Sequence, residues 1–359
     1  MSTAHTADPV PTSHRARRRR ATSLGLVLTA AGALLATAPA QAAAADLTVA
    51  ELPLLPGTTG SFASAINDTG TVVGHSGGLP TRWAPDGTAT ALATLPGQTR
   101  GGATAINNSG VAVGTATLDD GTSRPVRWAA DGTLSELTTP PDVAITSVLG
   151  INDSGTAVGM IVLNDTYEIH AARWNTDGTV TDLGTLPGGT YSQARAINDS
   201  GTVVGFAEDA GGVIRAVRWT PSGTIERLAT PGTETSQAWG INDSGSIVGF
   251  TGTSREQALR WDSGGAVSVL AIPADAQSGR ARDINDNGQI TGSYYNYRFG
   301  TLPSWWEADG TFAALENPSG YCCMARPWAI NNSGVIVGNL TVTGSSGERG
   351  VRWTPVVPD

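Results

Sequence analysis

A ten-residue segment that recurs seven times constrains this chain more than any other feature of its sequence. The copies are AINDTGTVVG (65–74), AINNSGVAVG (105–114), GINDSGTAVG (150–159), AINDSGTVVG (196–205), GINDSGSIVG (240–249), DINDNGQITG (283–292) and AINNSGVIVG (329–338). Each copy is followed by a Trp, namely Trp83, Trp128, Trp174, Trp219, Trp261, Trp306 and Trp353. A repeat of about 40–45 residues that is rich in turns is typical of a propeller blade.

The turn residues divide each repeat into strands. Asn-Asp-Ser-Gly between apolar segments favours a tight hairpin, because the polar side chains bond their own backbone and Gly accepts a positive φ. A second signal such as Pro85-Asp86-Gly87 follows most of the Trp residues and predicts another hairpin. Each unit therefore supplies four short antiparallel strands. We predict an all-β chain folded as a seven-bladed β-propeller.

The two ends of the repeat array complement each other. The last unit stops at RWTPVVPD (352–359) and lacks a fourth strand, whereas DLTVAELPLLPG (46–57) resembles a fourth strand without a blade. We expect this N-terminal strand to pair into the C-terminal blade, which would close the ring and remove exposed sheet edges. Residues 43–359 would then form a single domain.

The first 42 residues have the pattern of a secretory signal peptide. Five arginines (15, 17, 18, 19 and 20) precede the apolar run LGLVLTAAGALLATA, and Ala40-Gln41-Ala42 is a small-x-small cleavage signal. We expect cleavage after Ala42 and a secreted, extracellular protein of bacterial type. The sequence leaves open the general and the twin-arginine export routes. No other stretch approaches the roughly 20 apolar residues of a membrane span.

Charge and histidine content exclude several classes of function. The chain has 22 basic residues, all Arg, against 31 acidic ones. Such a surface repels phosphate backbones, so we expect no nucleic-acid partner and no binding to anionic membranes. Beyond the leader only His75 and His170 remain. A zinc site or a histidine-dependent triad is therefore not predicted, nor is any other metal or cofactor. We expect a monomer.

The repeat resembles a known family. The unit A/G-I-N-x-x-G-x-x-x-G, followed by an Arg-Trp pair, by x-D-G and by DLGTLPGG (182–189), is similar to the repeats of secreted bacterial proteins called the HAF family of extracellular repeats. The His-Ala-Phe of that name is blurred, and IHAARW (169–174) comes nearest. The resemblance implies a secreted propeller and carries no assigned reaction.

Features shared by every unit are expected to build the scaffold. The repeated Trp would fill the gap between neighbouring blades. The Arg that precedes it in six units would bind a motif acid or a turn carbonyl, because a buried guanidinium needs partners.

Variation between the repeats predicts a binding site. The position three residues before the motif Asn ends the blade-to-blade crossover and begins the innermost strand. Around the ring it is Ser64, Thr104, Leu149, Arg195, Trp239, Arg282 and Trp328. An arc of small or aliphatic residues thus faces an arc of alternating Arg and Trp, with Arg280 and Arg326 close behind. Stacking on indole rings and hydrogen bonds from guanidinium groups could hold a ligand there.

Aromatic residues extend this predicted surface. Tyr294, Tyr295 and Tyr297 lie in one loop, and Tyr321 lies in the next crossover. They could bind a sugar or a protein, or they could simply pack on one another. The adjacent Cys322 and Cys323 could close a strained vicinal disulfide. A bridge between chains and two free thiols remain alternatives.

Two functions fit these residues. The first is a binding module that recognises a carbohydrate or an extracellular protein through the variable loops, which we favour. The second is a polysaccharide-degrading hydrolase or lyase with an arginine-rich site for acidic sugars. No pair of acids stands at a recognisable glycosidase separation in the sequence, and histidine, the commonest general base, is scarce. A surface-layer role is a third possibility.

Overall fold

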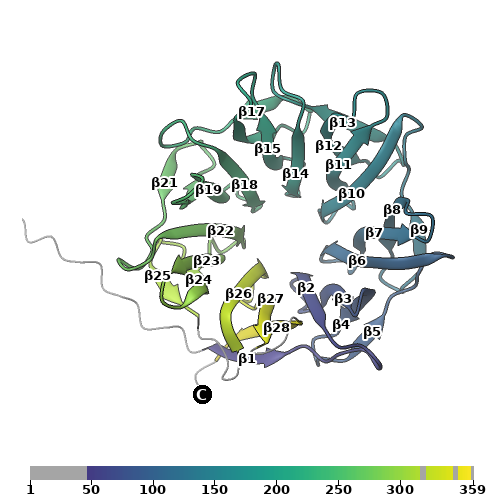
Figure 1. Cartoon of the computed structure of the whole chain (residues 1–359), viewed down its shortest axis with the longest axis horizontal. Helices are drawn as coiled ribbons and strands as arrows, with labels where there is room; N and C mark the ends of the chain where they lie inside the picture. The colour runs from purple at the N-terminus through teal and green to yellow at the C-terminus, as the bar shows by residue number, and fades with distance from the viewer. Residues whose placement is uncertain (1–46, 316–320, 343–346, 357–359) are drawn as a thin grey trace, which may run out of the picture. The chain divides into compact units, whose positions relative to one another are not determined.

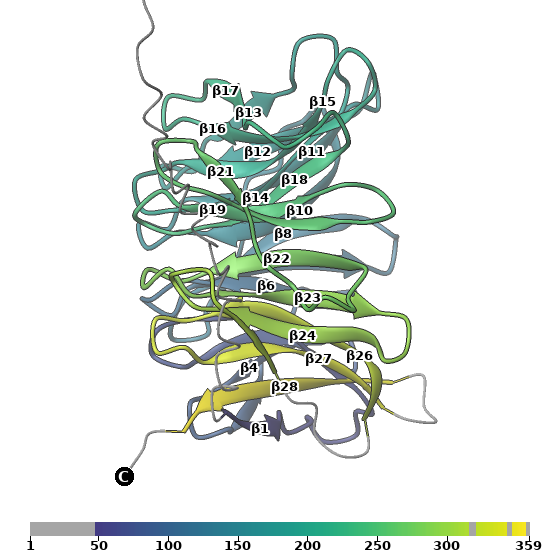
Figure 2. The same cartoon turned by 90° about the vertical axis from the view of Figure 1, so that its left-hand side faces the viewer.

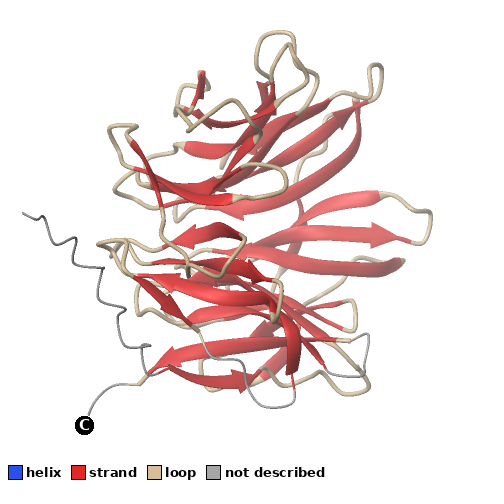
Figure 3. Cartoon of the chain, turned by 60° about the vertical axis from the view of Figure 1, so that its left-hand side comes forward, coloured by secondary structure: helices blue, strands red, loops and turns tan. Residues whose placement is uncertain are grey.

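The computed structural model describes residues 47–315, 321–342 and 347–356, except the side chains of residues 321–323 and 342. Within this part every regular element is a β-strand (Figure 3). It contains no helix long and apolar enough to cross a membrane. The prediction of an all-β chain is therefore confirmed.

Five antiparallel sheets of four strands are formed by consecutive segments of the chain. The first contains β2 (Ser61–Ile66), β3 (Val72–Ser76), β4 (Leu79–Trp83) and β5 (Ala89–Ala91). The second contains β6 (Gln98–Ile106), β7 (Ala112–Leu118), β8 (Ser123–Trp128) and β9 (Leu134–Glu136). The third contains β10 (Val143–Ile151), β11 (Ala157–Leu163), β12 (Ile169–Trp174) and β13 (Val180–Gly184). The fourth contains β14 (Ser192–Ile197), β15 (Val203–Glu208), β16 (Ile214–Trp219) and β17 (Ile225–Arg227). The fifth contains β18 (Ser236–Ile241), β19 (Ile247–Thr251), β20 (Gln257–Trp261) and β21 (Val267–Val269).

The remaining eight strands form one larger mixed sheet. Its first half contains β22 (Ser278–Ile284), β23 (Ile290–Asn296), β24 (Gly300–Trp306) and β25 (Phe312–Ala314). Its second half contains β26 (Tyr321–Ile330), β27 (Ile336–Val342), β28 (Glu348–Pro355) and the N-terminal β1 (Leu47–Glu51). The halves are joined by a single parallel pairing of Thr301 in β24 with Met324 in β26. Strand β1 lies antiparallel to β28, with Val49 opposite Trp353.

The first strand of each group of four lies nearest the centre of the molecule. Figure 1 shows β2, β6, β10, β14, β18, β22 and β26 around a common centre, with the other strands farther out. Successive innermost strands contact one another, including β26 with β2. Figure 2 shows the same sheets from the side. The position of the variable residues on innermost strands thus agrees with the prediction.

The motif Asn closes the hairpin between the first two strands of a group. In the fourth sheet the backbone N–H of Asn198 donates to Thr202 O, and Gly201 N–H donates back to Asn198 O. The Asn198 side-chain oxygen accepts from Ser200 Oγ and from Thr202 N. Gly201 has a φ of 83°, which glycine adopts without strain. The Asn-Asp-Ser-Gly turn is the one that the sequence predicted.

The repeated Trp packs between neighbouring sheets. Trp219 of β16 is fully buried in a cluster that also contains Val158 and Leu183 of the preceding sheet. Its Nε1–H donates to Leu183 O at 2.9 Å. Trp128 makes the equivalent bond to Ala93 O, across its own sheet boundary. The indole thus contributes both buried area and a polar link, as expected for the residue that holds sheet on sheet.

Candidate functional site at the two ends of a central channel

Two cavities lie between the innermost strands. Their linings share five isoleucines and Asp283, so we refer to them together as the central channel. One cavity is lined by the motif Asn residues and the residues after them, and we call it the Asn end. The other contains Arg195, Trp239, Arg282 and Trp328, and we call it the Arg–Trp mouth. The four residues that the crossover pattern singled out therefore line one cavity.

A β-bulge explains why the variable residue enters the channel. In the fourth sheet Ala194 pairs with Gly205 and Ala196 pairs with Val204, which leaves Arg195 as an extra residue. The register shifts at the same place in all seven innermost strands. The extra residues are Ser64, Thr104, Leu149, Arg195, Trp239, Arg282 and Trp328. Bulges of this kind re-aim a side chain and are frequent beside functional sites.

The last Gly of the motif is required by the same bulge. A Cβ on Gly205 would lie 2.0 Å from Gln193 O, far inside any real contact. The equivalent distance at Gly249 is also 2.0 Å, to Gln237 O. Glycine at this position is therefore explained by the close approach of two strands, and a larger residue would push the bulge open.

The Arg and Trp side chains of the mouth form an alternating stack. Arg195 Cζ lies 4.2 Å from the centre of the Trp239 ring. Arg282 Cζ lies 4.4 Å from the same ring and 4.2 Å from the Trp328 ring. Each Trp face that an Arg covers gains a cation–π contact. Beyond Trp328 the row continues with Phe62, at a centroid distance of 5.7 Å, and with His75 stacked on Phe62 at 5.5 Å.

The guanidinium of Arg282 is buried without adequate partners. The residue is 8% exposed, and its Nε and Nη1 have no hydrogen-bond partner within the described part of the chain. Burial, followed by the positive charges of Arg280, Arg195 and Arg326, lowers the pKa of Arg282 to about 9. Burial also lowers the pKa of Arg195, whose Nε is likewise unpartnered among the described residues. An unpaired buried charge costs several kcal/mol, so this arrangement is a strained one.

A third cavity opens beside the Arg–Trp mouth. It is lined by Arg280, Arg282, Arg326, Glu256, Tyr294 and Tyr295, with Ser278, Gly279, Ser293 and Thr301, and we call it the lateral pocket. Arg282 lines both this pocket and the mouth. Arg280 forms a salt bridge with Glu256 and lies over the Phe250 ring at 4.8 Å. The predicted residues Arg280, Arg326, Tyr294 and Tyr295 are therefore brought together around Arg282.

The remaining predicted residues are not gathered there. The prediction that the three tyrosines share a loop is wrong, because Tyr294 and Tyr295 lie within β23 and only Tyr297 lies in the turn that follows it. Tyr297 is 79% exposed, contacts Tyr295 edge-on at 5.7 Å, and lines neither the mouth nor the lateral pocket. Tyr294 is 9% exposed and packs edge-on against Phe312 at 5.5 Å, so part of the tyrosine cluster does pack internally. The side chains of Tyr321, Cys322 and Cys323, with the proposed vicinal disulfide, lie outside the described residues.

Several residues near the mouth were missed by the sequence reasoning. Phe206 and Phe250 follow the last Gly of their motif copies and pair across the strand with Gln193 and Gln237. Phe206 lies under Arg195, with Cζ 5.4 Å from its ring. This position varies between repeats as much as the bulge position does, and its variation was the available signal.

Asp283 is a second missed residue. It stands where the other motif copies have Ala or Gly, and it lines both ends of the channel. Its Oδ1 accepts from Ile284 N and its Oδ2 accepts from Ile330 N, each at 2.9 Å. Burial raises the pKa of Asp283 to about 6, although these two bonds act in the opposite direction. The departure from the repeat pattern was the signal that could have identified it.

The Asn end is a closed network of hydrogen bonds. The side-chain amide of each motif Asn donates to the main-chain oxygen of the next motif Asn, as from Asn198 to Asn242 O at 3.1 Å. The same bond occurs from 67 to 107, 107 to 152, 152 to 198, 242 to 285, 285 to 331 and 331 back to 67. Each motif Asn therefore closes its own turn with Oδ1 and binds the neighbouring strand with Nδ2. The second role is invisible in one repeat taken alone.

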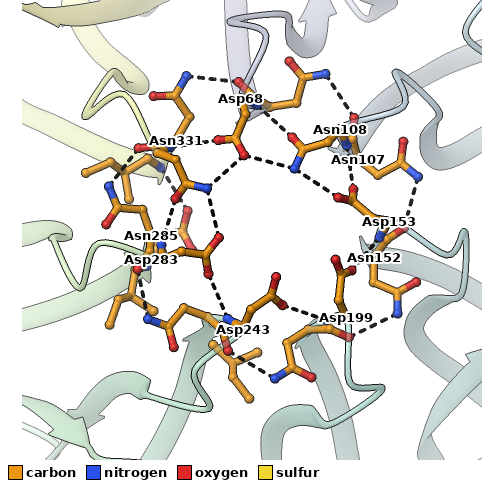
Figure 4. Close-up of a pocket in the computed structure, with 18 of the residues that line it drawn as sticks. Asp68, Asn107, Asn108, Asn152, Asp153, Asp199, Asp243, Asp283, Asn285 and Asn331 are labelled. Carbon is orange, nitrogen blue, oxygen red and sulfur yellow. Dashed lines mark hydrogen bonds between the residues drawn. The ribbon is translucent and has the colours of Figure 1, made fainter.

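A second circle of polar residues faces the opening at this end (Figure 4). The backbone N–H of each residue after the motif Asn donates to the side chain of its counterpart in the next repeat, as from Asp199 to Asp243. Asn108 and Asn332 also donate to the carboxylates on either side of them. Burial, followed by the charges of Asp243, Asp153 and Asp286, raises the pKa of Asp199. Each of these side chains has partners within the circle.

The repeated Arg residues bind turn carbonyls, as predicted. Arg82 donates from Nη1 to Ala130 O at 2.8 Å and from Nη2 to Gly110 O at 2.9 Å. Arg352 binds Pro85 O and Gly70 O in the same way. Arg218 instead pairs with Glu226 at 2.7 Å. Arg82 and Arg352 thus link one sheet to the next, whereas Arg218 pairs within its own sheet, and all three belong to the scaffold.

Metal ligation is not indicated by the described residues, which contain no group of three or more His, Cys, Asp or Glu placed to hold an ion. His170 lies away from the mouth linings, and its Nδ1 is 2.7 Å from Asp182 Oδ2. His75 ends the aromatic row, and burial lowers the pKa of its imidazole.

Comparisons with known proteins identify the fold. The sequence matches no protein-family model and no curated protein. Among solved structures, a streptogramin B lyase superposes with a TM-score of 0.56 at 14% identity, covering 86% of this chain and 97% of that one. An oligogalacturonate lyase in complex with manganese gives 0.57 at 12% identity, covering 86% and 96%. A virginiamycin B lyase from Staphylococcus aureus gives 0.52 at 15% identity, covering 87% and 100%. Likeness at such low identity establishes architecture only, and it shows that the chain has a β-propeller fold.

Proposed function

We propose that the protein is a secreted seven-bladed propeller of the HAF repeat type that binds a carbohydrate at its Arg–Trp mouth. Three observations support the blade count and ring closure. The eight-stranded sheet is held together across its middle by a single pairing, which fits two blades in contact. Strand β1 pairs with β28 and would complete the last blade. The Asn hydrogen bonds pass through all seven repeats and return to Asn67.

Export is supported by the sequence of the first 42 residues, with their arginines, apolar run and Ala40-Gln41-Ala42. The repeat pattern supports the HAF assignment. We further propose that the protein acts as a monomer.

The observation that carries the binding proposal is the stack of Arg195, Trp239, Arg282 and Trp328 in the mouth. Trp239 and Trp328 are only partly buried and line a cavity of about 380 Å³. The apolar faces of sugar rings pack on indoles, and sugar hydroxyls accept hydrogen bonds from guanidinium groups. The mouth offers both kinds of group on one side of a preformed cavity, as small-molecule sites usually do.

A glycan screen tests this proposal. The mature chain, Trp239→Ala and Trp328→Ala would be compared on plant, animal and bacterial cell-wall glycans, with Tyr167→Ala as control because Tyr167 is 77% exposed on another loop. We expect a glycan that binds wild type and the control equally and binds either Trp variant at least tenfold more weakly. Absence of any binding glycan, or equal binding by both Trp variants, would reject the proposal.

A polysaccharide-degrading enzyme is the second candidate, and His75 is the observation that favours it. Its Nδ1 is buried and has no partner among the described residues, and burial lowers the pKa of the imidazole, which favours the neutral form that a general base requires. New reducing ends or unsaturated uronates formed from a bound polysaccharide by wild type, and not by His75→Ala, would establish this function.

A further inference from the structure

Two charged residues of the described structure each line more than one cavity. Asp283 lines both ends of the channel, and Arg282 lines both the Arg–Trp mouth and the lateral pocket. Its side chain is held between the indoles of Trp239 and Trp328 and also lines the lateral pocket. Arg280 and Arg326 line that pocket as well. Three guanidinium groups therefore line the lateral pocket.

The positive charge in this space is not neutralised by the surrounding chain. Glu256 is the acidic residue in the lateral pocket's described lining, and its carboxylate is already paired with Arg280. Asp283, the next residue in the chain, has both carboxylate oxygens occupied by backbone N–H groups of Ile284 and Ile330. Nε and Nη1 of Arg282 remain without partners, as described above.

This cluster of positive charge contrasts with the net negative charge of the whole chain. The chain has 31 acidic and 22 basic residues, so carboxylates to pair with these arginines were abundant. The repeated arginines elsewhere, such as Arg82, bind carbonyl oxygens of neighbouring turns. A buried guanidinium with free nitrogens is instead matched by an oxyanion, which can accept two N–H bonds in the fork geometry of Arg.

We propose that the lateral pocket binds an anionic oxygen-bearing group, a carboxylate, sulfate or phosphate, through Arg282 with Arg280 and Arg326. Where this group belongs to a sugar, the ring to which it is attached lies at the Arg–Trp mouth, so the natural ligand is an acidic carbohydrate. The identification of the ligand as an acidic sugar rests on the proposed function. The binding of the anionic group itself does not.

Calorimetric titration of the mature chain tests the binding of an anionic group separately from the identification of the ligand as an acidic sugar. The probes are sodium sulfate, sodium phosphate and glucuronate, with glucose as the neutral counterpart of glucuronate, all at one ionic strength maintained with chloride. We expect at least one of the three anions to bind, and glucuronate to bind at least tenfold more tightly than glucose. Arg282→Met should weaken anion binding at least tenfold, because it removes the charge and keeps the length of the side chain.

Two further variants control for folding and for net charge. Arg326 also lines this pocket, and Arg326→Met should weaken anion binding by a smaller factor, so the proposal does not depend on one substitution. Arg227→Met makes the same change in net charge on the exposed outermost strand β17 and should bind like wild type. Circular dichroism and the unfolding midpoint of each variant would verify that it is folded.

The outcomes distinguish the two proposals. Binding of sulfate or phosphate that is lost in Arg282→Met supports the anion pocket even if no glycan binds. Glycan binding that is equal for acidic and neutral chains, and unchanged in Arg282→Met, supports the mouth and overturns the anion pocket. Absence of binding by all three anions, or equal loss in Arg227→Met, overturns it as well.

Discussion

The two ends of the channel are built from the same seven strands and differ in how their polar groups are satisfied. At the Asn end each motif Asn closes its own turn and binds the next strand, and each following Asp or Asn is bonded to its neighbours. At the Arg–Trp mouth, formed by the residues three positions before the motif Asn, Arg282 keeps its buried Nε and Nη1, and Arg195 its buried Nε, without partners among the described residues. The scaffold arginines 82, 173 and 352 each leave a buried Nε unpartnered among the described residues but bind carbonyl oxygens with their other nitrogens. Arg282 is distinguished by its second unpartnered nitrogen, Nη1, as in a site that awaits a ligand.

The difference separates positions that the scaffold keeps constant in every repeat from positions that can vary and serve function. The motif Asn is the same in every repeat because it closes its own turn and also bonds to the repeats on both sides, so one substitution breaks all of these links. The mouth residue is the extra residue of a bulge, and its side chain leaves the ladder. It can change from Ser64 to Arg282 without altering the pairing of its strands.

The largest effect is expected from Asn198→Ala at the Asn end. The substitution removes the acceptor for Ser200 and Thr202 and the donor to Asn242 O at a buried position. We expect a loss of about 2–4 kcal/mol in the free energy of unfolding, because several buried groups lose their partners at once. Urea unfolding measures it. Asn164→Ala, which removes one exposed bond of 3.3 Å, should stay within about 0.5 kcal/mol. Similar losses in the two variants would contradict the structural role of the Asn network.

Arg282→Met should change the free energy of unfolding by a smaller amount, and in the opposite direction to the same substitution of a scaffold arginine. Replacing an uncompensated buried charge with an apolar side chain of similar length should raise the free energy of unfolding by about 1–3 kcal/mol. Arg82→Met should lower it by about 1–3 kcal/mol, because Ala130 O and Gly110 O lose their donors. Both are measured by urea unfolding without added ligand. A destabilised Arg282→Met would show that the buried charge is structural, and the contrast between the two ends would weaken.

Asp283 gives a pH-dependent prediction between the two ends. Its pKa is raised to about 6 in the folded chain, from an ordinary value of 3.8. Between these values the folded state keeps a proton that the unfolded chain has lost, so this residue makes stability fall as the pH rises from about 4 to about 6. Because Asp283 is partly exposed to the channel, we expect a fall of about 1–2 kcal/mol rather than the full value.

The comparison with Asp283→Asn isolates this contribution, since other acids titrate over the same range. The free energy of unfolding of wild type relative to the variant should decline between pH 4 and pH 6 and then stay level. The Asn side-chain amide, placed against Ile330 N–H, could destabilise the variant by a constant amount, but this would not change how the difference in free energy varies with pH. A difference between the two proteins that does not vary with pH would show that the pKa of Asp283 is the same in the folded and the unfolded chain.

Much of this structure follows from the repeat, and what does not follow depends on neighbours. The turns, the four-stranded antiparallel sheets, the inter-sheet Trp and the carbonyl-binding Arg were predictable because each depends on local pattern or on burial of a large side chain. The grouping of Arg195, Trp239, Arg282 and Trp328 also followed, since equivalent positions on the innermost strands face one centre.

The rest could not be predicted because it arises between repeats. The bulge is a mismatch between two strands, and the pattern of one strand does not contain it. The second role of the motif Asn needs the next repeat beside it. The pairing of Glu256 with Arg280 joins residues of different sheets, and nothing in their spacing of 24 residues indicates it. The position of a residue within the repeat was enough to predict that it lies on an innermost strand. Its contacts depend on the strands beside it and could not be predicted from that position.

The smallest effect tests how far the mouth extends. Tyr297→Ser should change the free energy of unfolding by less than about 0.5 kcal/mol, because the side chain is 79% exposed and its contact is an edge of Tyr295. Tyr294→Ala is the matched comparison and should cost about 2–4 kcal/mol, because it empties a buried position against Phe312. Binding of the glycan found in the screen should change less than twofold in Tyr297→Ser, since Tyr297 lines neither cavity. A tenfold loss in that variant would instead place the exposed tyrosine in the site and extend the binding surface along the β23–β24 hairpin.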